Sequence, residues 1–480
     1  MSKSQSRRDF LKVSGLAASV AASGAFTSLA SARPQQKSDA AASAGDLAVW
    51  TTTGDQRLAR GPALQWRPAS GGPAADAVLL DPSEQFQEIL GFGAAFTDAA
   101  CYTFNRLTPA AREKLFHTLF HPSETGLSVC RTCIGSSDYS TKLYSFDEGD
   151  PDPDLTRFSI DHDREYILPM LREARKANPD LFLFSSPWSP PGWMKANGSM
   201  LGGSMRRKYM AAYAAYFQKF LQGYSAAGVP VQAVTVQNEV DTDQDGRMPA
   251  CLWPQEYEAD FVSQYLGPAL QNSGTKIWII DHNYNLWGRA IGELETPDVH
   301  KYTNAIAWHG YVGQPEWMLR VHDAIPGVEM YWTEGGPDYK SPDYATDWTN
   351  WSKTFIEILR CWCRSITGWN LALDEQGRPN IGPFSCGGLV TINSESKAVS
   401  YSGQYWAFAH FSRFIQRGAR RFDSQSSAKD LAHAAFRNPD GKKTVVLANS
   451  GQGRTCDLWM GGMAASVALE KDSVTTMVWD

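Results

Sequence analysis

Two glutamates follow apolar segments that have the composition of buried β-strands. Residues 231–236 are uncharged and rich in β-branched side chains, and they lead into Asn238 and Glu239. Residues 328–332 form a second, mainly apolar segment, which leads to Glu334. Short apolar strands of this kind are typical of a parallel sheet buried on both faces. One carboxyl group at a strand end is commonly a solvated charge, but two at one edge of a sheet are what glycoside hydrolysis requires.

Polar and aromatic residues also lie at or just beyond the carboxyl ends of other predicted strands, at the edge where α/β barrels carry their active sites. These residues are Arg131 and Asp138, Trp188, Asp281 with His282 and Asn283, His309 with Tyr311, and Trp369 with Asn370. One such strand end can arise by chance. Several of them together are better explained by a functional site than by solvation alone.

The residue types predict the chemistry of a retaining glycosidase. We expect Glu239 to be the acid/base and Glu334 the nucleophile, with carboxyl groups roughly 5 to 5.5 Å apart across the barrel mouth. Arg131 is of the right type to keep Glu334 ionised, because a nearby cation favours the charged form. Asn238, next to the acid/base, would bond the 2-hydroxyl of the sugar. The walls of the sugar pocket would be Trp188, Tyr311 and Trp369.

The order of the predicted elements indicates an α/β fold, a (β/α)8 TIM barrel. Eight apolar strands alternate with helical patterns, and eight is the number that closes such a barrel. We expect the strands at residues 89–96, 127–135, 181–186, 231–236, 276–281, 305–308, 328–332 and 366–371. The helices are expected at residues 109–119, 161–177, 205–226, 254–273, 286–294, 316–323 and 348–364.

The two ends of the mature chain have a different pattern. Residues 46–84 alternate apolar and polar side chains, and residues 406–480 contain a return helix followed by short strands. Because the strands at the C-terminal end need partners, we expect both segments to form one small side β-sandwich. The barrel would then occupy residues 85–405.

The N-terminal segment has the pattern of an export signal. Arg7 and Arg8 precede a mildly apolar stretch and an Ala-Ser-Ala cleavage site at residues 30–32. This arrangement predicts a twin-arginine signal peptide at residues 1–32 and a linker at residues 33–45, with a periplasmic or extracellular destination. The stretch is too short and too polar for stable membrane insertion. Because this route exports folded proteins, the eight cysteines need not form disulfides.

Composition excludes some partners. The net charge of −6 and the sequence pI near 5.9 provide no basic surface for nucleic acid. We expect a β-linked glucoside or glucan as substrate, and neither a cofactor nor a metal. The sequence does not indicate an oligomeric state.

Two motifs resemble metal or redox sites but fit them poorly. Residues 241–246 begin like a calcium loop, yet Leu252 stands where that loop needs a bidentate glutamate. A polar rim loop on the aglycone side is the better interpretation. Cys130 and Cys133 lie three positions apart on a predicted strand and so face opposite sides, which favours two packed thiols, with Arg131 on the interior face beside Cys133. For His282, a functional and a structural role are about equally supported.

The chain resembles glycoside hydrolase family 30 in five segments that occur in family order. They are residues 91–100 (GFGAAFTDAA), 186–195 (SPWSPPGWMK), 235–239 (TVQNE), 368–373 (GWNLAL) and 410–415 (HFSRFI). The resemblance implies a barrel with a side β-sandwich and a retaining β-glycosidase in which Glu239 is the acid/base and Glu334 the nucleophile. It also implies glycone-binding roles for Arg131, Asp138, Trp188, Asn238, His309, Tyr311 and Trp369.

Two departures from the family pattern leave the substrate open. Val240 stands where glucosylceramidase-like members often have proline, and Gly335 and Gly336 follow the predicted nucleophile. A β-glucosidase or glucosylceramidase-like enzyme is the leading interpretation, and an endo-β-1,6-glucanase or a β-xylosidase is the alternative. A non-catalytic carbohydrate-binding protein is the alternative from another class, although such a protein would not need both glutamates.

Overall fold

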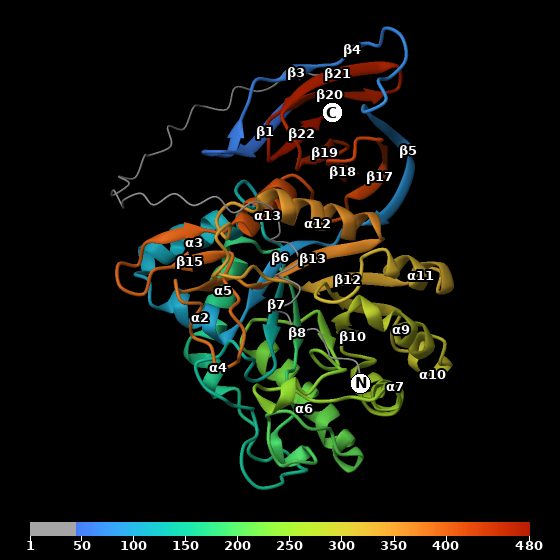
Figure 1. Ribbon diagram of the computed structural model, residues 1–480. Helices are drawn as coiled ribbons and strands as arrows, with labels where there is room; N and C mark the ends of the chain where they lie inside the picture. Colours follow the sequence, from blue (N-terminus) through green and yellow to red (C-terminus); the bar gives the residue numbers. More distant parts are fainter. Residues whose placement is uncertain (1–44) are drawn as a thin grey trace.

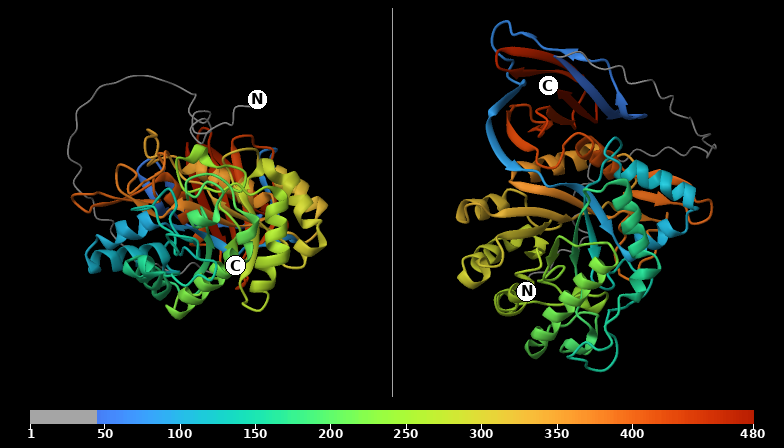
Figure 2. Two further views of the ribbon diagram at one scale, coloured as in Figure 1. Left: turned by 90° about the horizontal axis from the view of Figure 1, so that it is seen from below. Right: turned by 180° about the vertical axis from the view of Figure 1, so that it is seen from behind.

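The computed structural model describes residues 45–480. The predicted signal peptide and residues 33–44 of the predicted linker lie outside this range. The described chain forms a closed barrel with a β-sandwich stacked on one side of it (Figure 1), and Figure 2 shows the same arrangement from behind. Among the helices of residues 45–480, none has the length and apolar character that crossing a bilayer requires.

Eight parallel strands close the barrel in the order β10-β11-β12-β13-β6-β7-β8-β9. Each of them overlaps one of the predicted strands, so the (β/α)8 prediction is confirmed. Their bounds are β6 (Gly91–Phe96), β7 (Val129–Cys133), β8 (Phe182–Ser186), β9 (Ala233–Thr235), β10 (Lys276–Asn283), β11 (Ala305–His309), β12 (Glu329–Glu334) and β13 (Cys363–Asn370).

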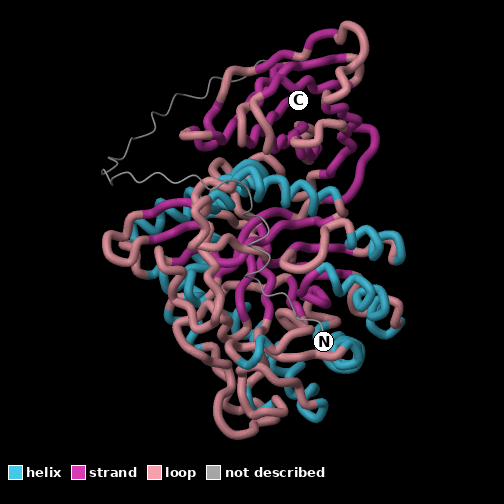
Figure 3. The backbone as a smooth tube through the Cα atoms, in the orientation of Figure 1, coloured by secondary structure: helices cyan, strands magenta, loops and turns pink. Residues whose placement is uncertain are grey.

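Helices cover the outside of the barrel, while the strands lie in its interior (Figure 3). The predicted helices correspond to α3 (Pro109–Phe120), α4 (Asp161–Glu165), α5 (Ile167–Ala177), α6 (Met210–Ala226), α7 (Gln255–Phe261), α8 (Gly267–Leu270), α9 (Trp287–Leu294), α11 (Trp317–Ala324) and α12 (Trp348–Arg360). The helix expected at residues 161–177 is broken at Tyr166, whose φ of −145° is not helical. The one expected at residues 254–273 contains a π-helical turn, η4 (Val262–Leu266).

Two short helices were not predicted, α2 (Asp98–Asn105) and the single turn α10 (Pro297–His300). α2 begins immediately after β6, with the Thr97 hydroxyl accepting a hydrogen bond from the Ala100 amide as an N-terminal cap. The sequence hid α2 because most of its residues are buried, so it lacks the polar face that marks an amphipathic helix.

The sandwich is assembled from both ends of the described chain, as predicted. β1 (Asp46–Thr53) pairs with β22 (Ser473–Trp479), and β5 (Val78–Glu88) pairs with both β17 (Arg420–Gln425) and β20 (Arg454–Met460). β5 continues past the boundary expected at residue 84. β17 was missed because its charged residues obscure the alternation of apolar and polar positions. The remaining strands include β18 (Leu431–Arg437), β19 (Lys443–Asn449) and β21 (Met463–Leu469).

α12 and α13 (Gly403–Ser412) lie between the barrel and the sandwich (Figure 1). His410 on α13 joins the two bodies, because its ring nitrogens lie 2.8 Å from the hydroxyl oxygens of Thr52 on β1 and Thr476 on β22. The ring is fully buried, and burial lowers the pKa of His410 to about 3. The ring is therefore neutral at physiological pH.

Alternate residues along the barrel strands form layers inside the barrel. The layer at the amino-terminal ends is apolar, with Trp278 and Tyr331 stacked at a ring-centroid distance of 4.1 Å. Two positions further along the same strands the inward residues become polar, as Phe184 gives way to Ser186 and Tyr331 to Thr333. This change places a hydrogen-bonding layer at the carboxyl ends of the strands.

Candidate active site

Asp281 is the centre of the polar layer. Its carboxylate accepts hydrogen bonds from hydroxyls on three other barrel strands and from Arg131 and His309. The hydroxyls are Ser186 at 2.8 Å, Thr235 at 2.7 Å and Thr333 at 2.7 Å. Burial alone would raise the pKa of Asp281, but the charge of Arg131 and the bond from His309 hold that pKa well below its usual range. Asp281 is therefore a buried permanent anion.

A β-bulge turns Asp281 into the barrel. Trp278 points into the interior, so simple alternation would put Ile280 inside and Asp281 outside. The register with β11 shifts between Ile280 and His282, and both Ile280 (φ 74°) and Asp281 (φ 42°) adopt left-handed conformations. Ile280 consequently packs in the outer core, and the carboxylate of Asp281 reaches the interior. Bulges often re-aim a side chain in this way beside active sites.

Arg131 connects three groups of the site. Its Nη1 donates to Oε2 of Glu334 at 2.6 Å, and its Nη2 donates to Asn238 Oδ1 at 2.8 Å and to Asp281 Oδ2 at 2.7 Å. The side chains of Arg131, Glu334 and Asp281 are all fully buried. Arg131 shares the inward face of β7 with Cys133, whereas Cys130 packs in the outer core, as the alternation predicted.

Two tryptophans pack over the guanidinium. Trp188 and Trp369 are stacked with ring centroids 4.9 Å apart, and the guanidinium carbon of Arg131 lies 4.5 Å and 5.5 Å from their centroids. Their indole N–H groups are buried and have no hydrogen-bond partner among residues 45–480. The indole N–H groups of Trp278 and Trp332 in the barrel core are in the same state, so this feature does not by itself mark a ligand site.

His309 lies between the two glutamates. Its Nδ1 is 3.5 Å from Glu239 Oε1, and its Nε2 is 3.9 Å from Glu334 Oε2 and 3.0 Å from Asp281 Oδ1. Glu239 and Glu334 therefore reach the two nitrogens of one ring at the same barrel mouth. Burial opposes the charged form, but the charge of Glu334 and the bonds to Asp281 and Glu239 raise the pKa of His309 to about 9. The ring is thus an imidazolium among carboxylates.

Each glutamate has a further partner. The Tyr311 hydroxyl donates to Glu334 Oε1 at 3.0 Å, and the Gln244 side-chain amide donates to Glu239 Oε2 at 2.5 Å. Glu239 itself adopts a left-handed backbone conformation (φ 57°). Eight of the predicted site residues thus belong to one contact network. They are Arg131, Trp188, Asn238, Glu239, His309, Tyr311, Glu334 and Trp369.

Asp138 lies at the edge of this network. It is buried in the loop after β7, where its backbone carbonyl accepts a hydrogen bond from the Ile381 amide. A Cβ on Gly382 would come within 2.5 Å of the Asp138 Cβ, so the two loops pack closely here. The next residue, Tyr139, packs edge-on against Trp369.

Several residues of the site were not assigned a role from the sequence. Asp281 was noted at a strand end, but the bulge that aims it inward is invisible to alternation. Ser186, Thr235 and Thr333 occupy the inward positions that follow Phe184, Ala233 and Tyr331, and this spacing is a signal that can be found in the sequence. Gln244 left no such signal, because it contacts Glu239 from a loop.

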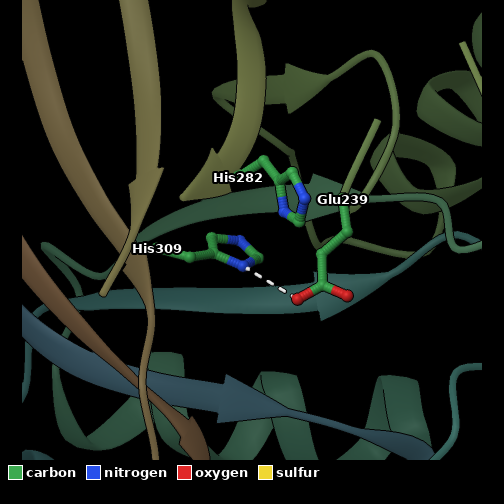
Figure 4. A group of neighbouring side chains, drawn as sticks. All are labelled: Glu239, His282 and His309. Atoms are coloured by element: carbon green, nitrogen blue, oxygen red, sulfur yellow. Dashed lines mark ion pairs between the residues drawn. The ribbon is translucent and has the colours of Figure 1, made fainter. Parts of the chain in front are cut away.

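Three possible metal ligands also come together. Ligand atoms of Glu239, His282 and His309 all lie within 4.8 Å of one another, and Figure 4 shows the two rings beside the carboxylate. The raised pKa of His309 means that a cation would have to displace a proton from its ring. The arrangement favours ion pairing over metal binding, and the expectation of no metal stays a prediction. All eight cysteines are buried free thiols.

Two family models match the chain. Residues 89–415 match the glycosyl hydrolase family 30 TIM-barrel domain, and residues 418–477 match the glycosyl hydrolase family 30 beta sandwich domain. An endo-1,6-beta-D-glucanase of Neurospora crassa is 34% identical over 77% of this chain and 80% of its own length. The lysosomal acid glucosylceramidase of Mus musculus is 29% identical over 78% of this chain and 77% of its own length.

Solved structures agree with the sequence relatives. The endo-beta1,6-glucanase BT3312 superposes with a TM-score of 0.83 at 29% identity, covering 91% of this chain and 99% of that one. SrfJ from Salmonella typhimurium superposes with a TM-score of 0.86 at 26% identity, covering 90% of this chain and 99% of that one. The resemblance found in the sequence is confirmed. The chain belongs to glycosyl hydrolase family 30.

Proposed function

We propose that this protein is a retaining β-glycosidase that hydrolyses β-linked glucosides or glucans, with Glu239 as acid/base and Glu334 as nucleophile. The observation that carries the proposal is that the two carboxylates lie beside the two nitrogens of His309, and that of the two only Glu334 accepts a hydrogen bond from Arg131. Two buried carboxylates at one mouth, with different partners, can take different roles in one reaction.

In the first step, Glu334 attacks the anomeric carbon as the bond to the leaving oxygen breaks. Glu239 gives its proton to that oxygen, and a covalent glycosyl-enzyme results. Arg131 and Tyr311 both donate hydrogen bonds to Glu334, which orients its carboxyl group for the attack. In the second step, Glu239 takes a proton from a water that attacks the same carbon, and the bond to Glu334 breaks.

The remaining residues would hold the sugar. Arg131 occupies the Oδ1 of Asn238, which leaves the Asn238 amide as a donor toward the 2-hydroxyl. The stacked rings of Trp188 and Trp369 would form one wall of the sugar pocket. His309 and Tyr311 border the same pocket, and Asp138 would complete it from the neighbouring loop.

The test is a panel of aryl β-glycosides and β-glucans, with the configuration of the released sugar followed by NMR. We expect turnover of the aryl β-glucoside and first appearance of the β-anomer, as double displacement requires. First appearance of the α-anomer would contradict the roles of the two glutamates. Absence of turnover on every aryl β-glycoside would instead favour a carbohydrate-binding protein.

Endo-β-1,6-glucanase action is a second candidate within the same class. It is supported by the names of the Neurospora crassa relative and of the BT3312 structure. Hydrolysis of β-1,6-glucan into mixed oligosaccharides would identify endo action, whereas release of glucose alone would identify exo action.

We also propose that residues 1–32 are a twin-arginine signal peptide, that residues 33–45 are a linker, and that the mature enzyme is periplasmic or extracellular. Residues 46–84 and 406–480 would form one structural unit beside the barrel at residues 85–405. Replacing Arg7 and Arg8 by lysine should block export of the full chain, as measured by fractionation. N-terminal sequencing of the exported protein should begin just after Ala32.

A further inference from the structure

Residues 241–247, which we name the acid-side loop, begin two positions after Glu239. Apart from Gly246, every residue of this loop carries a side chain that can form hydrogen bonds. Its residues are exposed or half-buried, so they line the outer rim of the site. Since a catalytic acid must reach the leaving oxygen, groups that touch the carboxylate of Glu239 from this loop lie on the side of the leaving group.

Gln244 is the residue of this loop that reaches Glu239. Its Nε2 donates to Glu239 Oε2 at 2.5 Å, while His309 Nδ1 lies 3.5 Å from Oε1. An N–H donor stabilises the carboxylate and not the protonated acid. The hydrogen bond from Gln244 therefore disfavours the protonated form of Glu239, which is the form that protonates a leaving group. When that form is present, the Gln244 amide needs another acceptor.

The backbone of the acid-side loop holds Gln244 in place. Gln244 (φ 52°) and Asp245 (φ 53°) are both left-handed, a conformation that costs energy unless the surroundings enforce it. Asp243 accepts hydrogen bonds from the amides of Asp245 and Gly246, at 3.1 Å and 3.0 Å. A Cβ on Gly202 would lie 2.9 Å from the Gly246 Cα, so a neighbouring loop packs tightly against this one.

We infer that the acid-side loop forms the first aglycone subsite, that this subsite takes a hydroxyl-bearing sugar, and that Gln244 transfers its hydrogen bond from Glu239 to an aglycone hydroxyl. The inference rests on the proposed role of Glu239. A sugar supplies acceptors for the released amide and hydroxyls for the carboxylates of the loop. A lipid aglycone supplies almost none, and covering these polar groups with hydrocarbon would cost free energy.

The experiment compares Gln244→Ala with the wild-type enzyme on three substrates. They are an aryl β-glucoside, whose leaving group needs little acid assistance, a β-1,6-linked glucose disaccharide, and a glucosylceramide in mixed micelles. For the variant we expect kcat/KM on the disaccharide to fall about five- to tenfold, the effect of one lost hydrogen bond, and on the aryl glucoside less than about twofold. The wild-type enzyme should prefer the disaccharide to the glucosylceramide.

The pH dependence of kcat/KM is a second test, because it would not change if Gln244 had only a structural role. Removing the donor from Glu239 should shift the alkaline limb of kcat/KM to higher pH, because the protonated acid then persists longer. Gln244→Glu should shift it further in the same direction, since a second carboxylate disfavours ionisation. Gln264→Ala is the matched control, because Gln264 is an exposed glutamine bonded to Asp260, and it should leave both readouts unchanged.

Equal losses on aryl glucoside and disaccharide, an unmoved alkaline limb, or faster cleavage of glucosylceramide than of disaccharide would overturn the inference. Each of these outcomes requires a wild-type enzyme that cleaves the aryl glucoside. Failure of the wild-type enzyme on that substrate would contradict the proposed function itself, so the two failures are distinguishable.

Discussion

Arg131 donates a 2.6 Å hydrogen bond to Glu334, and solvent reaches neither side chain. The same guanidinium bonds Asp281, so one cation compensates two buried carboxylates. Charges taken out of water are costly unless they are paired and hydrogen-bonded. The ion pairs of Arg131 should therefore contribute to the stability of the fold.

Replacing Arg131 by methionine should be strongly destabilising. The substitution removes the guanidinium from Asp281 and Glu334 and leaves His309 as the one cation beside both carboxylates in the described site, and breaking a buried pair in this way costs about 3–5 kcal/mol. Urea unfolding at neutral pH measures the loss. The control is Arg164→Met, because Arg164 forms a salt bridge to Asp161 with both side chains largely exposed, and it should change stability by less than about 1 kcal/mol. Equal effects of the two substitutions would contradict the burial argument.

The two glutamates should respond differently to substitution. Glu334→Ala should abolish turnover of an aryl β-glucoside while leaving sugar binding measurable by calorimetry. Glu239→Ala should reduce kcat on a substrate with a poor leaving group by roughly 10²- to 10⁴-fold, the usual contribution of a general acid. In Glu239→Ala the rate of the first step should fall less on a substrate with a good leaving group, because such a group needs less protonation. A Glu334→Ala enzyme with normal turnover would exclude it as nucleophile.

Acid should weaken the contact between barrel and sandwich through His410. Its folded-state pKa of about 3 lies below the unfolded value near 6.5, so the neutral ring is the form that stabilises the fold. This contribution is fully present above the unfolded pKa and is lost as pH falls from about 6.5 toward 3. At pH 5 the loss relative to pH 7 should be about 2 kcal/mol.

Denaturant unfolding at several pH values measures this slope. In His410→Gln the free energy of unfolding should differ less between pH 7 and pH 5 than in the wild-type protein, whatever the absolute stability of the variant. His433 is also buried, and its pKa is lowered to about 4, so part of the acid sensitivity will remain. An unchanged slope in the variant would show that His410 does not titrate as its burial requires.

Chelation should leave activity unchanged. The site contains three potential metal ligands, Glu239, His282 and His309. The raised pKa of His309, however, places a proton where a metal would bind. We expect the same kcat before and after dialysis against EDTA, and no stoichiometric transition metal by elemental analysis. Loss of activity with EDTA and recovery with one added metal would support a metal-dependent hydrolase instead.

Local sequence patterns were sufficient to predict the barrel strands and the positions of both glutamates. Alternation and β-branched composition mark a buried strand, and a strand end locates a side chain on the active edge of a barrel. The same alternation placed Arg131 on the inward face of β7. These features depend on neighbours in sequence, which is why a single chain reveals them.

Tertiary structure decided which of these side chains meet. Asp281 became the centre of the polar layer only through the bulge at Ile280, and alternation alone would have directed it outward. Its partner Arg131 is 150 positions away in the chain, and only the closing of the barrel brings the two together. Gln244 reaches Glu239 because loop packing against Gly202 fixes its backbone. Periodicity specifies burial and direction along one strand, whereas distances between strands and loops are set by the packing of the whole barrel.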